Sequence, residues 1–203
     1  MVSNSVVTFA LKAATILGVS LTLLGVTNSG ALAAKCSSTG GGYAAWKPQM
    51  AAEAKAAGIG AKGIAALMAT SYARATINAD RNQHSFKLGL KAFLAKRGAA
   101  AIVSRGRRMK AANAALFARI EKRFGVPAGP LVAIWGMESA FGGGSGGQNT
   151  LSAIATLAYD CRRSEYFTDH LMAALKLVDR GVLSSATKGA MHGEIGHTQF
   201  LPK

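Results

Sequence analysis

Apolar residues recur at intervals of three and four along most of the chain from about residue 43 onward. This spacing places one apolar stripe on each helix and is the period of an amphipathic α-helix. Helices are predicted over residues 43–57, 64–79, 86–96, 107–124, 127–138, 151–159 and 167–179. No segment shows the alternation of apolar and polar residues that is typical of a half-buried strand. The pattern therefore predicts an all-α fold.

Glycine and proline mark several helix boundaries. Gly125 ends one helix, Pro127 lies in the first turn of the next, and Gly181 follows the last. The sequence contains no internal repeat and no linker within its C-terminal part. We therefore expect a small-residue linker over 34–42 and one domain over 43–203.

The first 33 residues have the order of a secretory signal peptide. Lys12 is their single charge, an apolar run follows over residues 13–26, and the segment ends in an A-x-A motif at Ala33. The run is shorter than the roughly 20 residues that span a bilayer. We expect cleavage near Ala33 or Ala34 and release to the periplasm with no remaining membrane span. The alternative is a signal that is retained as an anchor.

Export to an oxidising compartment bears on the state of the two cysteines. An even number of cysteines in an oxidising compartment favours a disulfide, and the chain contains only Cys36 and Cys161. We predict a bridge between them. The alternative is two free, buried thiols.

Composition adds a strongly cationic surface. The 203 residues include 24 Lys and Arg but 9 Asp and Glu, and half of all residues are apolar, which excludes a disordered basic tail. Such a charge favours an anionic partner: nucleic acid, a lipid surface or an acidic polymer such as a cell wall. The densest basic cluster, at Arg105, Arg107, Arg108 and Lys110, has no interleaved aromatic residues. We interpret it as a solvated face, and export argues against nucleic acid as the partner.

Glu138 is the first candidate for chemistry. It ends the apolar helix over 127–138 and precedes the glycine-rich segment 142–147. The partial negative charge of a helix C-terminus and apolar surroundings would both favour a protonated carboxyl group. Such a group can donate a proton to a glycosidic oxygen. The alternative is a solvated glutamate at a helix end.

The segment 192–197 superficially suggests a metal site, because it contains His192, Glu194 and His197. On a helix the two histidines would be about 140° apart around the axis, too far for a shared ligand face. Two glycines in the segment favour a turn. We therefore predict no metal here, and expect the histidines to line a cleft or fill a turn.

Four blocks of sequence, in this order, resemble the lytic murein transglycosylase B family: residues 124–127, 131–142, 155–167 and 196–202. Residues 80–86 resemble another family segment more weakly. The resemblance implies an α-helical domain similar to goose-type lysozyme, with a long cleft for peptidoglycan glycan strands. It also implies cleavage of the β-1,4 bond between N-acetylmuramic acid and N-acetylglucosamine, leaving 1,6-anhydromuramoyl ends, by a monomer without a cofactor.

Glu138 matches the single catalytic acid of this family. The resemblance further implies a set of substrate-binding residues: Ser139, Tyr159, Arg162, Arg163, Gln199 and Phe200. Gln199 would hydrogen-bond sugar or acetamido groups, and Tyr159 would stack on a sugar. The two arginines would meet muramoyl or peptide carboxylates; alternatively, they are a surface pair beside the disulfide.

The chain also departs from the family pattern. Ala190 replaces a small hydroxyl residue, and His192 and Glu194 occupy positions that are more often small. Family members continue for several tens of residues beyond the position of Lys203, so we expect a C-terminally truncated domain. The alternative function is therefore a catalytically inactive, peptidoglycan-binding protein.

Overall fold

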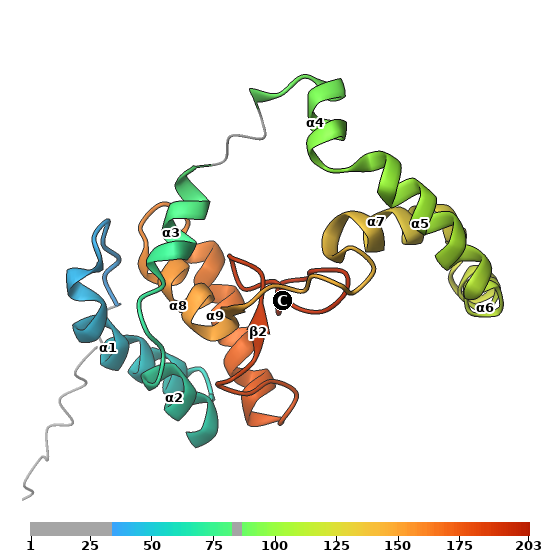
Figure 1. The fold of residues 1–203 in the computed structure, drawn as a ribbon. Helices are drawn as coiled ribbons and strands as arrows, with labels where there is room; N and C mark the ends of the chain where they lie inside the picture. The colour runs from blue at the N-terminus through green and yellow to red at the C-terminus, as the bar shows by residue number, and fades with distance from the viewer. Residues whose placement is uncertain (1–33, 83–86) are drawn as a thin grey trace, which may run out of the picture. The chain divides into compact units, whose positions relative to one another are not determined.

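The computed structural model describes residues 34–82 and 87–203 (Figure 1). The predicted signal peptide lies outside these residues. Within the described ranges, none of the helices combines the length and the apolar character that crossing a membrane would require.

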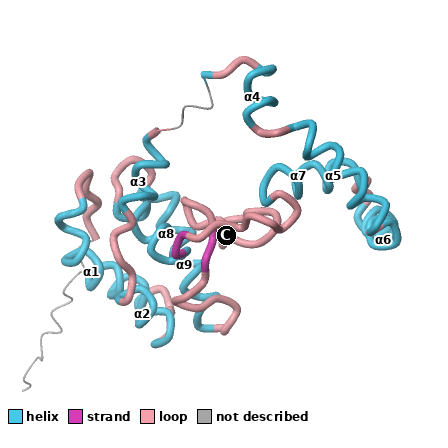
Figure 2. Tube along the Cα trace, viewed as in Figure 1, coloured by secondary structure: helices cyan, strands magenta, loops and turns pink. Residues whose placement is uncertain are grey.

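Helices make up most of the described chain, as Figure 2 shows. They are η1 (Gly40–Gly42), α1 (Tyr43–Ala56), α2 (Ala61–Met68), α3 (Arg74–Arg81), α4 (Leu90–Lys96), α5 (Ala99–Ala112), α6 (Ala114–Phe124), α7 (Ala128–Ser139), α8 (Thr150–Tyr159) and α9 (Ser164–Asp179). Two short strands, β1 (Gln148–Asn149) and β2 (Lys188–Gly189), pair antiparallel. The all-α prediction is confirmed apart from this small sheet, whose two-residue strands are too short to produce an alternating pattern.

The main apolar core surrounds α8. Every residue of this helix is buried, because its sequence is apolar or small on all sides, and α9, α3 and α2 pack against it. Tyr159 at its end joins an aromatic cluster with Tyr43, Trp46 and Tyr72, with ring centroids 5.5–6.2 Å apart. A second, smaller apolar cluster unites α5, α6 and α7 around Phe117.

The helix predicted over 64–79 is wrong in one respect, because the structure divides it into α2 and α3. The backbone N–H of Ser71 donates to the hydroxyl of Ser152, and the N–H of Ala73 donates to the hydroxyl of Thr156. Both acceptors belong to α8 and lie 81 and 83 positions further along the chain than their donors. Tertiary hydrogen bonds therefore satisfy backbone groups that a continuous helix would have used.

The helix predicted over 107–124 also differs. The structure begins it earlier, at Ala99, and divides it at Asn113 into α5 and α6. The side-chain amide of Asn113 donates to the carbonyl oxygen of Met109, which is the local competition with helical bonding that asparagine favours.

The segment predicted as a linker, 34–42, lies against the domain. The predicted disulfide between Cys36 and Cys161 is present, with Cα atoms 5.0 Å apart. Next to it, the backbone N–H of Ser37 donates to the carbonyl oxygen of Tyr159 at 2.9 Å. These contacts fix the start of the described chain to the end of α8.

Candidate active site

Glu138 is the next-to-last residue of α7, and its side chain is exposed. The helix begins directly after Pro127, whose fixed φ suits a helix start. The expected apolar surroundings of the carboxyl group are therefore not found. The predicted position at a helix end, before the glycine-rich loop, is correct, and it leaves the carboxyl group open to a ligand.

The backbone turns sharply after α7. Ala140 and Phe141 have φ angles of 47° and 58°, a left-handed conformation that is uncommon and costly for residues with a Cβ atom. Phe141 holds this turn in place, because its ring is buried and lies edge-on to Trp135 at a centroid distance of 5.4 Å. Within the described residues, the one other non-glycine residue of this kind is Gln199.

The hydroxyl group of Ser139 joins this turn to the segment that contains Gln199. It donates to the carbonyl oxygen of His197 at 2.6 Å and accepts from the backbone N–H of Gly142 at 3.0 Å. The Ser139 side chain is buried, with 1% of the residue exposed. The hydroxyl group is thus committed to the main chain, which favours a positioning role for Ser139 over the predicted substrate contact.

His197 reinforces the same junction. Its imidazole stacks on Trp135 at 5.9 Å with an interplanar angle of 12°. A Cβ atom at Gly142 would lie 2.7 Å from this imidazole, so glycine permits the close approach. His197 thus fills a turn, as expected of the histidines in this segment.

Gln199 lies next to the glycine-rich loop. Its side-chain Nε2 donates to the carbonyl oxygen of Gly196 at 2.6 Å and reaches that of Ser145 at 3.5 Å. The neighbouring Phe200 is 70% exposed, while its carbonyl oxygen accepts from the N–H of Ile195. The hydrogen bond between Ser139 and His197 brings the segment that contains Gln199 and Phe200 to the end of α7 that carries Glu138.

Three other predicted substrate-binding residues lie elsewhere. Tyr159 is 1% exposed inside the aromatic core, so its ring has no free face on which a sugar could stack. Arg162 and Arg163 both form ion pairs with the buried carboxylate of Asp80. This arrangement favours the alternative reading of the two arginines as a pair beside the disulfide.

The sequence did not predict the role of Asp80 as the ion-pair partner of the two arginines, because these residues are some 80 positions apart in the chain. Burial would raise the pKa of Asp80, but hydrogen bonds from Arg162 and Arg163 outweigh it and hold the pKa below its usual value. His192 adds a third basic group, with Nε2 3.7 Å from an Asp80 oxygen and Nδ1 3.3 Å from Glu194. His192 therefore lies, with Arg162 and Arg163, among the side chains that surround the Asp80 carboxylate. Among residues 34–82 and 87–203, no group of three or more potential ligands is placed to hold a metal ion.

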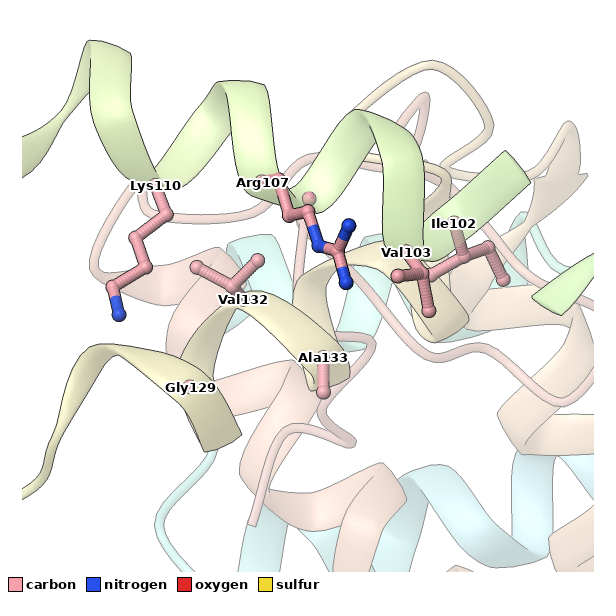
Figure 3. A pocket seen from close by; sticks show the side chains of 8 residues that line it. Ile102, Val103, Arg107, Lys110, Gly129, Val132 and Ala133 are labelled. Carbon is pink, nitrogen blue, oxygen red and sulfur yellow. The ribbon is translucent and has the colours of Figure 1, made fainter. Parts of the chain in front are cut away.

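A groove of about 240 Å³ runs between α5 and α7 (Figure 3). Its floor is apolar, with Ile102 and Val103 from α5 and Val132 from α7. Arg107 and Lys110 extend from α5 over the groove, and both are exposed, in agreement with a solvated basic face. The sequence did not predict this groove, because it depends on how the two helices pack.

Comparisons with known proteins show the family and the fold of the chain. The family model described as the transglycosylase SLT domain matches residues 42–203. The crystal structure of SltB3 from Pseudomonas aeruginosa in complex with NAG-anhNAM-pentapeptide is similar with a TM-score of 0.72 and 33% sequence identity, covering 79% of this chain and 43% of SltB3. No curated protein matches the chain.

Two further structures share the fold at lower identity. Escherichia coli Slt35 in complex with bulgecin A has a TM-score of 0.66 and 24% identity, covering 77% of this chain and 51% of Slt35. SltB1 from P. aeruginosa has a TM-score of 0.66 and 24% identity, covering 77% of this chain and 54% of SltB1. The chain thus spans about half the length of these neighbours. The lysozyme-like helical fold is confirmed, and the chain belongs to the transglycosylase SLT domain family.

Proposed function

We propose that this chain is a lytic transglycosylase that cleaves the β-1,4 bond between N-acetylmuramic acid and N-acetylglucosamine in peptidoglycan. The observation that carries the proposal is the exposed Glu138 carboxyl group at the end of α7, beside the turn that holds Gln199. SltB3, which is 33% identical, was crystallised with NAG-anhNAM-pentapeptide, a fragment that contains an anhydro sugar.

One carboxyl group is enough for this reaction. Protonated Glu138 donates its proton to the glycosidic oxygen as the bond from that oxygen to muramoyl C1 breaks. The oxygen of the muramoyl C6 hydroxyl then bonds to C1, and its proton passes to the Glu138 carboxylate. The sugar ends as a 1,6-anhydro product, Glu138 is protonated again, and no water is consumed.

The remaining acids support a single-carboxylate mechanism. Most glycosidases place a second carboxylate across the scissile bond. Here Asp160 is paired with Arg81, Asp169 with Lys203 and Glu194 with His192. Three of the four acids considered as a second carboxylate are thus engaged by protein partners, and the fourth, Glu165, lines the cavity beside the disulfide.

Gln199 and Phe200 are the proposed sugar contacts. Gln199 would hydrogen-bond an acetamido or hydroxyl group, and the exposed Phe200 ring offers an apolar face to a sugar. The net charge of +15 would attract peptidoglycan, whose stem peptides carry carboxylates. We further propose that the protein is exported by its N-terminal segment, acts in the periplasm and is a monomer.

The products of digestion test the proposal. Purified protein is incubated with peptidoglycan sacculi, and the released fragments are analysed by mass spectrometry. Anhydromuropeptides, each lighter by one water than a hydrolysis product, support a lytic transglycosylase. Reducing ends would instead indicate a hydrolase. Binding to sacculi without any product would support the alternative of a catalytically inactive wall-binding protein.

A further inference from the structure

The first described residue makes a specific polar contact. The backbone nitrogen of Ala34 donates a hydrogen bond to Oε1 of Glu53, which lies on α1. Both residues are half-buried, and Ala34 packs against the main apolar core. The contact joins residues 19 positions apart, so it is a tertiary contact and not a consequence of local helix geometry.

Neighbouring contacts hold Ala34 in this position. Cys36, two residues later, is bonded to Cys161, and Ser37 is hydrogen-bonded to the end of α8. These anchors leave Ala34 little freedom to move away from Glu53. Ala34 is therefore the residue whose backbone nitrogen is held next to the Glu53 carboxylate.

That residue coincides with the predicted cleavage site. The A-x-A motif ends at Ala33, so a cut after Ala33 makes the nitrogen of Ala34 the new N-terminus. Hydrolysis of that peptide bond adds one water, leaving a carboxylate on Ala33 and a protonated amine on Ala34. We propose that Glu53 is the binding residue for this new α-ammonium group, and that the mature chain begins at Ala34. This inference rests on the proposed export.

The surroundings favour a charged amine at this point. An uncleaved chain offers Glu53 one neutral N–H donor, whereas an ammonium offers three donors and a positive charge. Arg162 and Arg163 line the same cavity of about 670 Å³, but their guanidinium groups pair with Asp80. A cut after Ala34 would instead place the amine on Lys35, which is exposed.

The first test is the N-terminal residue of the exported, wild-type protein, read by N-terminal sequencing or by mass spectrometry of the terminal peptide. The inference predicts Ala34. A mature chain that begins at Lys35 or at any other residue overturns it.

The second test measures the reactivity of the amine. An ion pair with Glu53 slows modification of the α-amino group by an amine-reactive reagent near neutral pH, because the paired proton must first be lost. Glu53→Gln should speed labelling of this amine by about two- to fivefold. The matched control is Glu165→Gln, which removes a carboxylate from the same cavity and should leave the labelling rate unchanged.

Equal labelling rates in wild type and Glu53→Gln would overturn the inference, as would an equal acceleration by both variants. Neither test uses peptidoglycan. A protein that is active on sacculi but begins elsewhere contradicts only the inference about Glu53. A protein that begins at Ala34 but releases no fragments contradicts only the proposed function.

Discussion

Ser139→Ala separates two roles that a serine beside a catalytic acid can have. Sequence resemblance predicts a substrate contact, whereas the structure buries the hydroxyl group between two main-chain partners. If Ser139 binds substrate, its substitution changes KM and leaves the stability of the fold unchanged. If Ser139 instead holds the Gln199 segment against the end of α7, its substitution lowers both the stability of the fold and the reaction rate.

The expected magnitude follows from the two hydrogen bonds. Each contributes about 0.5–1.5 kcal/mol net, so the loss of both lowers the free energy of unfolding by about 1–3 kcal/mol. For a domain of this size, 1 kcal/mol corresponds to about 2–4 °C in Tm. Ser139→Ala should therefore lower Tm by about 2–12 °C and increase amide hydrogen exchange at Ile195, whose N–H bonds to Phe200 across the same turn.

Thermal unfolding and amide exchange of the purified variant test this prediction. The matched control is Ser145→Ala, because Ser145 is exposed in the glycine-rich loop and its known contact uses the backbone carbonyl oxygen. The control should retain the wild-type Tm. If Ser139→Ala keeps both the wild-type Tm and the wild-type exchange but raises KM, the positioning role is refuted.

Three further changes test the framework around the site. Asp80→Asn should lower the free energy of unfolding by about 2–4 kcal/mol at pH 7. Because the folded pKa of Asp80 lies below its ordinary value of 3.8, this contribution is present above about pH 4 and is lost at lower pH. Urea unfolding should therefore show a smaller difference between wild type and variant at pH 3. Gly146→Ala should destabilise the fold by more than 1 kcal/mol, since a Cβ atom there overlaps the backbone of β2 and φ is 90°, whereas Gly147→Ala, in open space, should change Tm by under about 2 °C. Reducing the Cys36–Cys161 bridge, which spans 125 positions, should lower stability by about 4–5 kcal/mol in the chain-entropy model, measured by unfolding with and without reductant.

Helices with strong local signals were predictable from the sequence. The start of α7 after Pro127 and the end of α6 at Gly125 both follow from the chemistry of single residues. The break between α2 and α3 was not predictable, because the groups that stabilise it, the hydroxyls of Ser152 and Thr156, come from α8. Local propensity contains no information about such distant acceptors.

In the candidate site, too, the features that depend on local sequence were predictable, and those that depend on packing were not. The position of Glu138 at a helix end was predictable from the apolar run before it and the glycines after it, but its exposure was not. Arg162 and Arg163 were predicted to bind an anion, and they do bind a carboxylate, that of Asp80. A sequence shows that a guanidinium needs an anionic partner; packing decides whether that partner is a ligand or the protein itself.

The most direct test of the central claim compares wild type with Glu138→Gln on peptidoglycan sacculi, with Glu121→Gln as the matched control because Glu121 is an exposed glutamate on α6. Since Glu138 is exposed, all three proteins should have the same Tm within about 2 °C. The account predicts that wild type and Glu121→Gln release anhydromuropeptides and that Glu138→Gln releases none. Release of anhydromuropeptides by Glu138→Gln at the wild-type rate would contradict it.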